Sequence, residues 1–135
     1  MTPVDEEATK ALHDLVPFAA TLGIEVLRNT REEVRARVAW SEARTTTGGA
    51  LNGGVLMGLA DNAGALCAFQ NLPEGAGGTS TVESKTNFLR ALRGGHATAI
   101  SRPLHIGRRF VVVETDVVDD DERLVARVTQ TQAVL

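Results

Sequence analysis

The spacing of apolar and polar residues predicts both strands and helices in the first half of the chain. Residues 33–40 alternate apolar and polar side chains, which is typical of a half-buried strand. This segment is predicted to pair with residues 23–27 through a polar turn. Apolar residues at helical spacing predict a short helix over residues 6–18, which Pro17 would end. The stretch 53–70 is too long for a strand and contains no proline, so it predicts a long helix.

Four further segments after this helix have the character of strands: residues 79–89, 96–105, 110–118 and 123–134. Short turns separate them, as in an antiparallel meander. The whole order predicts an α+β fold, in which the long helix covers one face of an antiparallel sheet of about six strands. A single domain over residues 1–135 is expected, because this length suits one core and no linker interrupts it.

Charge and cysteine usage exclude several classes of protein. The net charge of −3 and the pI near 5.6 argue against a nucleic-acid binder. Cys67 is the one cysteine, which argues against a disulfide and favours a reducing compartment. The first ten residues lack the features of a secretory signal, and the most apolar stretch is too short to cross a membrane. We therefore expect a cytoplasmic protein with no membrane association, no resident cofactor and no metal site.

Asp61 lies near the middle of the predicted long helix and has no basic neighbour. The sequence contains no lysine, arginine or histidine between Thr45 and Ser84, so the salt-bridge partners usual on a surface helix are missing. Small residues on the same helix predict a stripe open to another backbone or a slender ligand: Gly54, Gly58, Gly64 and Ala68. Asp61 is then either a solvated or capping residue, or a carboxylate in an apolar site. In such a site desolvation raises its basicity, so that it can act on a carbonyl as general base or nucleophile.

The tripeptide Asn52-Gly53-Gly54 stands at the predicted start of this helix. Backbone N–H groups there have no acceptor within the helix, and the positive end of the helix dipole is exposed. A carbonyl oxygen directed at the Gly53 N–H would be polarised, although a tight turn alone also explains two glycines. A phosphate-binding loop is excluded, because Gly54 and Val55 stand where it needs Lys and Ser or Thr.

The spacing of these motifs resembles a known family. Leu51-Asn52-Gly53-Gly54, with Asp61 nine residues after Asn52, is similar to the His-Gly-Gly and acidic-residue pattern of hotdog-fold acyl-coenzyme A thioesterases of the phenylacetate-pathway (PaaI-like) type. The segments 87–90 and 105–109 also resemble this family, and the likeness covers most of residues 15–135. It implies a single hotdog domain, in which a long central helix is wrapped by the sheet.

The resemblance further implies the hydrolysis of acyl- or aryl-coenzyme A to the free acid and coenzyme A, which enters as part of the substrate. Asp61 would be the base or nucleophile, and the Gly53 N–H the oxyanion donor. Thr81 matches a hydroxyl residue that assists the attacking water. Asn52 replaces the family's histidine, and Thr46 stands where relatives carry Asn or Gln to orient water.

The family's assembly is a dimer with two sheets joined edge to edge, commonly paired into homotetramers, with active sites at the subunit interface. Gly54 at the helix start is expected to contact coenzyme A. Three arginines are expected to bind its phosphates, because guanidinium groups bind phosphate in bidentate fashion: Arg90, Arg108 and Arg109. A plain solvated role is the alternative for each of the three.

Two other functions fit parts of the pattern. A hotdog hydratase or dehydratase would need a histidine as its acid or base, but His13, His96 and His105 all lie outside the central helix. A non-catalytic acyl-coenzyme A-binding protein is favoured by the departures at Asn52 and Thr46. Release of coenzyme A by the purified protein would separate hydrolysis from binding alone.

Overall fold

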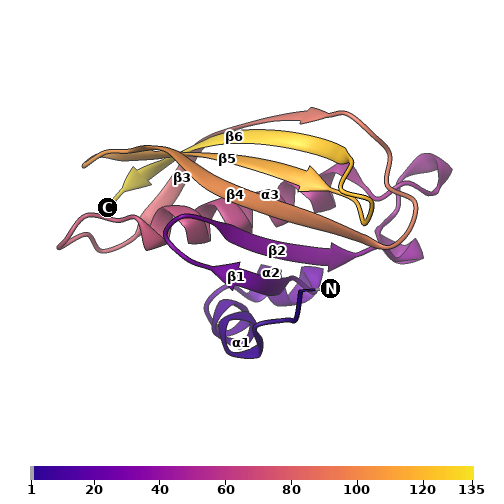
Figure 1. Ribbon diagram of the computed structural model, residues 1–135, viewed down its shortest axis with the longest axis horizontal. Coiled ribbons are helices and arrows are strands. Elements are labelled where there is room, and N and C mark those ends of the chain that lie inside the picture. The colour runs from indigo at the N-terminus through magenta and orange to yellow at the C-terminus, as the bar shows by residue number, and fades with distance from the viewer. Residues whose placement is uncertain (1) are drawn as a thin grey trace.

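The fold consists of one long helix held against a six-stranded sheet, with two short helices at one edge (Figure 1). The computed structural model describes residues 2–135. The helices are α1 (Glu6–Leu15), α2 (Pro17–Leu22) and α3 (Gly53–Gln70), with 3-10 turns at Glu42–Arg44 and Thr47–Gly49. The strands are β1 (Glu25–Asn29), β2 (Val34–Ala39), β3 (Thr79–Phe88), β4 (His96–Ile106), β5 (Phe110–Val118) and β6 (Leu124–Val134). The predicted long helix has the predicted bounds, and each predicted strand is present with small shifts at its ends.

The N-terminal helix differs from its prediction at Pro17. The residue that was expected to end one helix begins a second, because its fixed φ and missing N–H suit the first helical position. Val16, the residue before the proline, is extended with φ −125° and ψ 94°, as the proline ring requires. The segment is therefore two short helices joined at Val16. None of the helices in residues 2–135 is long and apolar enough to cross a membrane.

The strand order is β1-β2-β4-β5-β6-β3, and every pairing is antiparallel. The expected meander is wrong at β3, which pairs with β6 at the edge of the sheet rather than with β4, its neighbour in sequence. Strand β4 pairs instead with β2, although α3 and β3 lie between these two strands in the sequence. The result is the predicted hotdog architecture, with β3 along one free edge and the β1 side next to α1 and α2 (Figure 1).

The core lies between α3 and the inner face of the sheet. Alternate residues of β5 and β6 are buried there, which explains the period of two in the sequence. Leu59, Ala60, Cys67 and Ala68 of α3 are fully buried in this layer. Burial raises the pKa of the Cys67 thiol to about 11, so this cysteine is a packing residue rather than a nucleophile.

A network of charges on Glu33 connects β2 to β4. Its carboxylate accepts hydrogen bonds from Arg35 and, at 2.6 Å, from Arg102. Burial alone would raise the pKa of Glu33, but the hydrogen bonds and charges of these two arginines outweigh it, and the pKa lies below its ordinary value. Glu33 therefore stabilises the fold above the pKa of an unfolded glutamate, and this contribution is lost as the pH falls through the lowered value.

We expect Glu33→Gln to lower the free energy of unfolding by about 1–2 kcal/mol at pH 7, a small figure because the arginines are half-exposed. The difference from the unmodified protein should shrink below about pH 4. Urea titrations at several pH values measure it, with Glu32→Gln as the neighbouring control. A difference that stays constant down to pH 3 would contradict the ionic origin.

Candidate active site

Asp61 projects from the middle of α3 towards the β3 edge of the sheet, and its two oxygens have different surroundings. Oδ1 accepts one hydrogen bond from the Thr81 hydroxyl at 2.9 Å and another from Nε2 of Gln130 at 3.2 Å. Oδ2 accepts none within residues 2–135, and Asp61 is in no ion pair with that part of the chain. One oxygen is thus held in place and the other is open.

The prediction of a water-poor site is wrong for the single chain, in which Asp61 is exposed. Met57, one helical turn before Asp61 on α3, is nevertheless apolar and is 43% exposed. The carboxylate therefore lies beside an exposed apolar side chain that nothing covers in the single chain.

The small-residue stripe on α3 is not an open path to the carboxylate. A Cβ at Gly58 would lie 2.8 Å from Leu22, and a Cβ at Gly64 would overlap the side chain of Gln130. Gly54 lies against Oδ1 of Asn52, and Ala68 is buried in the core. The expectation of an approaching ligand is therefore wrong for this stripe, because the chain's own side chains fill the space.

The start of α3 has a free backbone donor, as its sequence predicts. Oδ1 of Asn52 accepts a hydrogen bond from Gly54 N at 2.7 Å and so caps the helix. Asn52, which stands where the family has a histidine, thus holds this turn through its side-chain amide. Gly53 N donates to no acceptor within the described residues. The Gly53 backbone is half-buried, and a Cβ added to this glycine would lie 3.1 Å from the Phe88 ring. With Gly54 N engaged in the cap, Gly53 N is the donor that remains for a ligand.

Asp61 and Gly53 are too far apart to act on one carbonyl from the same chain. They are eight residues apart on a continuous helix, which places them about 12 Å apart along its axis. An oxyanion donor and a base must each lie about 3 Å from the reacting carbonyl group. A single chain therefore contributes one of these groups to any one site.

The two predicted threonines differ in their surroundings. The Thr81 hydroxyl donates to Asp61 while accepting from Nε2 of Gln132 at 2.6 Å, so it is bound to the carboxylate itself. Thr46 is exposed in the loop before α3, where its backbone N donates to Ala50 O. Its side chain makes no hydrogen bond within residues 2–135. Thr81 is thus brought to Asp61, whereas Thr46 is not.

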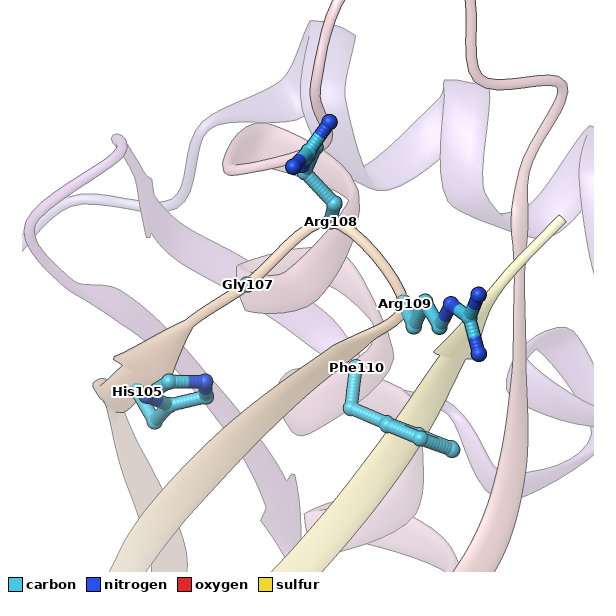
Figure 2. A pocket seen from close by; sticks show the side chains of 5 residues that line it. All are labelled: His105, Gly107, Arg108, Arg109 and Phe110. Carbon is cyan, nitrogen blue, oxygen red and sulfur yellow. The ribbon is translucent and has the colours of Figure 1, made fainter.

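The predicted phosphate-binding arginines lie at opposite ends of the sheet. Arg90 lines a hollow of about 460 Å³ together with Gly53 and Phe88. Arg108 and Arg109 form the tip of the β4–β5 hairpin, beside a hollow of about 470 Å³. Figure 2 shows their guanidinium groups pointing in different directions from this turn. One chain therefore offers Arg90 close to its Gly53 and the other two arginines elsewhere.

Histidines do not contribute to this site. His13 of α1 bonds Ile24 O at 2.7 Å, and His96 at the start of β4 lies 3.8 Å from Asp120. His105 lines the hollow at the β4–β5 hairpin. The arrangement around Asp61 thus contains none of the acid or base groups that a histidine-dependent hydratase needs.

Gln130 and Gln132 of β6 are the residues near Asp61 that sequence reasoning missed. Both lie on the inner face of the sheet, where Ala126 and Val128 precede them. Alternation along β6 does place two amides at inward positions, and a buried amide needs a hydrogen-bond partner. That signal points to a polar partner across the layer, but it does not identify α3 as its source.

The chain is similar in sequence and in fold to known proteins of one family. The model of the thioesterase superfamily matches residues 48–126. ComA2 of Bacillus subtilis is 31% identical over 114 residues, which are 84% of this chain and 90% of that protein. The 1,4-dihydroxy-2-naphthoyl-CoA hydrolase of Escherichia coli is 30% identical over 87 residues, 64% of this chain and 63% of that enzyme. A mutant of thioesterase PA1618 of Pseudomonas aeruginosa superposes with a TM-score of 0.88 at 27% identity, covering 100% of this chain and 96% of that one.

Proposed function

The chain belongs to the thioesterase superfamily, and from this premise we propose that it hydrolyses acyl- or aryl-coenzyme A to the free acid and coenzyme A. Asp61 is the general base or nucleophile of this reaction. The observation that carries the proposal is the pair of unequal oxygens on Asp61, one held by Thr81 and Gln130 and the other open. A carboxylate fixed in this way presents one oxygen in a constant direction.

The reaction needs a base and an oxyanion donor. As general base, Oδ2 of Asp61 takes a proton from water while the water oxygen bonds to the thioester carbon, and the coenzyme A thiolate leaves as the carbonyl re-forms. As nucleophile, Oδ2 itself bonds to that carbon, the thiolate leaves to give an anhydride, and water then cleaves the anhydride. In both routes the Gly53 N–H donates to the carbonyl oxygen as negative charge develops there.

A second copy of the chain completes each site. The separation of about 12 Å along α3 supports a site built from Gly53 of one chain and Asp61 of another. The exposed apolar side chain of Met57, one helical turn from Asp61, also supports a covering partner. Once a partner covers Met57 and Asp61, the loss of water raises the basicity of the carboxylate.

The β3 edge is the surface where the second copy joins. This strand runs from Thr79 to Phe88 with β6 on one side only, so its other side offers free backbone donors and acceptors. Thr81 lies near one end of β3, level with Asp61, and Phe88 at the other end packs on Gly53. A two-fold axis near the middle of β3 therefore brings the Gly53 of one chain level with the Asp61 of the other.

The same pairing supports a composite phosphate site. Arg108 and Arg109 lie near the Thr79 end of the sheet, since Val134 pairs with Thr79 and bonds Arg109 O. Arg90 lies beside Gly53 near the other end. The two-fold axis brings these two ends together from different chains, where they can share one coenzyme A molecule.

An apolar hollow suits the acyl group. A space of about 440 Å³ between α1 and α3 is lined by Leu15, Leu66 and Phe69. Ala65, one helical turn after Asp61, and Thr79 at the start of β3 also line it. This size supports a small to medium acyl or aryl group, and the Escherichia coli relative is named for an aryl thioester.

The test is release of coenzyme A by the purified protein. Acetyl-, hexanoyl- and benzoyl-coenzyme A are each incubated with the protein and a thiol-reactive dye. We expect release over many turnovers, with a higher kcat/KM for the two larger acyl groups. Binding of all three thioesters without release would instead identify a non-catalytic acyl-coenzyme A-binding protein.

A further inference from the structure

Two buried glutamines of β6 lie on the inner sheet face next to Asp61. Gln130 is 0% and Gln132 1% exposed. They are two residues apart on one strand, so both side chains point to the same face. A buried amide costs free energy unless it is hydrogen-bonded, so two of them in a small core require an explanation.

The hydrogen bonds from these glutamines run in one direction and end on the carboxylate. Thr79 donates to Oε1 of Gln132 at 2.8 Å, and Nε2 of Gln132 donates to the Thr81 hydroxyl at 2.6 Å. Because Thr81 accepts there, its own proton is free for Oδ1 of Asp61. Nε2 of Gln130 donates to the same Oδ1. Two donors from β3 and β6 thus converge on one oxygen of an ionised carboxylate.

Gln130 reaches Asp61 because α3 has no side chain at Gly64. A Cβ at Gly64 would overlap Oε1 of Gln130, so the amide occupies the space of the missing side chain. That Oε1 is buried and has no hydrogen-bond partner. The reverse amide orientation would set Oε1 against the carboxylate oxygen, so the orientation with an unpaired Oε1 is the one that serves Asp61.

We propose that Gln130 and Gln132 are positioning residues that saturate Oδ1 of Asp61, directly and through Thr81, and so make Oδ2 the oxygen that reacts. Thr81 belongs to the carboxylate's support and does not orient water. The inference rests on the proposed hydrolysis by Asp61 but concerns different residues. Gly64 is the backbone position that admits the Gln130 amide to the site.

The first test replaces Gln130 by an apolar side chain of similar shape. Gln130→Met removes the donor to Oδ1 and the unpaired Oε1 together, so we expect the fold to be retained. A mobile carboxylate should lower kcat about 10- to 100-fold and change KM less than about threefold. Gln132→Met, which frees the Thr81 hydroxyl, should lower kcat in the same way. Thr129→Val, on the opposite face of the same strand, is the control and should keep full activity.

The second test uses a pH profile, which a merely structural role would leave unchanged. The carboxyl of a Gln130→Glu variant can donate to Oδ1 only while it is protonated, and its pKa is raised by the neighbouring Asp61 and by burial. We therefore expect kcat of this variant to fall with rising pH above about pH 5, where the unmodified protein is level or rising. This readout holds even if Gln130→Met fails to fold.

The outcomes separate this inference from the proposed function. A folded Gln130→Met with unchanged kcat, or a Gln130→Glu profile parallel to that of the unmodified protein, would overturn the positioning role. Neither result would affect the proposal that Asp61 hydrolyses thioesters. An active Asp61→Asn would overturn that proposal instead, whatever the glutamine variants do.

Discussion

Asp61→Asn is expected to lower kcat for acyl-coenzyme A hydrolysis by at least about 10³-fold, because an amide has neither the basicity nor the nucleophilicity of a carboxylate. The substitution keeps the shape of the side chain. The amide oxygen can still accept the hydrogen bonds that Oδ1 accepts from Thr81 and Gln130. Release of coenzyme A under saturating thioester measures the effect, and KM should change much less than kcat.

The control for this variant is another carboxylate outside the site. Asp14 of α1 is exposed and pairs with Lys10 at 2.6 Å. Asp14→Asn should therefore leave kcat unchanged, and thermal unfolding of both variants should match that of the unmodified protein within about 1 kcal/mol. Retention of more than a tenth of the activity by Asp61→Asn would show that another group is the base or nucleophile.

Gly53→Pro is expected to lower kcat about 10²- to 10³-fold relative to Gly53→Ala, because it removes the backbone N–H that stabilises the developing oxyanion. Proline is well suited to the first position of α3, and Asn52 before it already has φ −61° and ψ 136°. Both substitutions place the same Cβ against the Phe88 ring, at 3.1 Å. The comparison therefore removes the effect of the Cβ and leaves that of the N–H and of the ring atom that replaces its hydrogen, and equal activities would exclude the N–H as the oxyanion donor.

Mixing the two inactive variants tests whether each site is shared between subunits. A hybrid dimer of Asp61→Asn and Gly53→Pro contains one site with an intact carboxylate and an intact N–H. After unfolding and refolding together, an equimolar mixture should recover roughly a quarter of the unmodified activity, because half of the dimers are hybrids with one working site each. No recovery above the separately refolded variants would mean that one chain contains the whole site.

Local sequence predicted the elements and the two chemical groups of the candidate site. The length of the stretch 53–70 without a proline and the strand character of residues 110–118 do not depend on distant residues, and both elements were confirmed with their bounds. The lack of a basic residue near Asp61 likewise followed from composition alone. Pro17 shows the limit of such signals, since a proline that ends one helix serves equally well to begin another.

Tertiary structure decided which side chains meet. The pairing of β3 with β6 brings Gln130 and Gln132 to Asp61 from about 70 residues away, and no periodic pattern specifies that pairing. Gly64 and Gly58 were predicted to leave α3 open, but Gln130 and Leu22 fill the space, because close packing leaves few voids in an interior.

The three-dimensional structure also decided the exposure of Asp61 and its distance from Gly53. Helical rise separates two groups that lie close together in sequence, and the edge position of β3 leaves the carboxylate uncovered in a single chain. The sequence by itself thus predicted the two groups that we propose carry the chemistry, Asp61 and the Gly53 N–H. Their arrangement depends on long-range packing of whole faces, which a local pattern of apolar and polar residues does not encode.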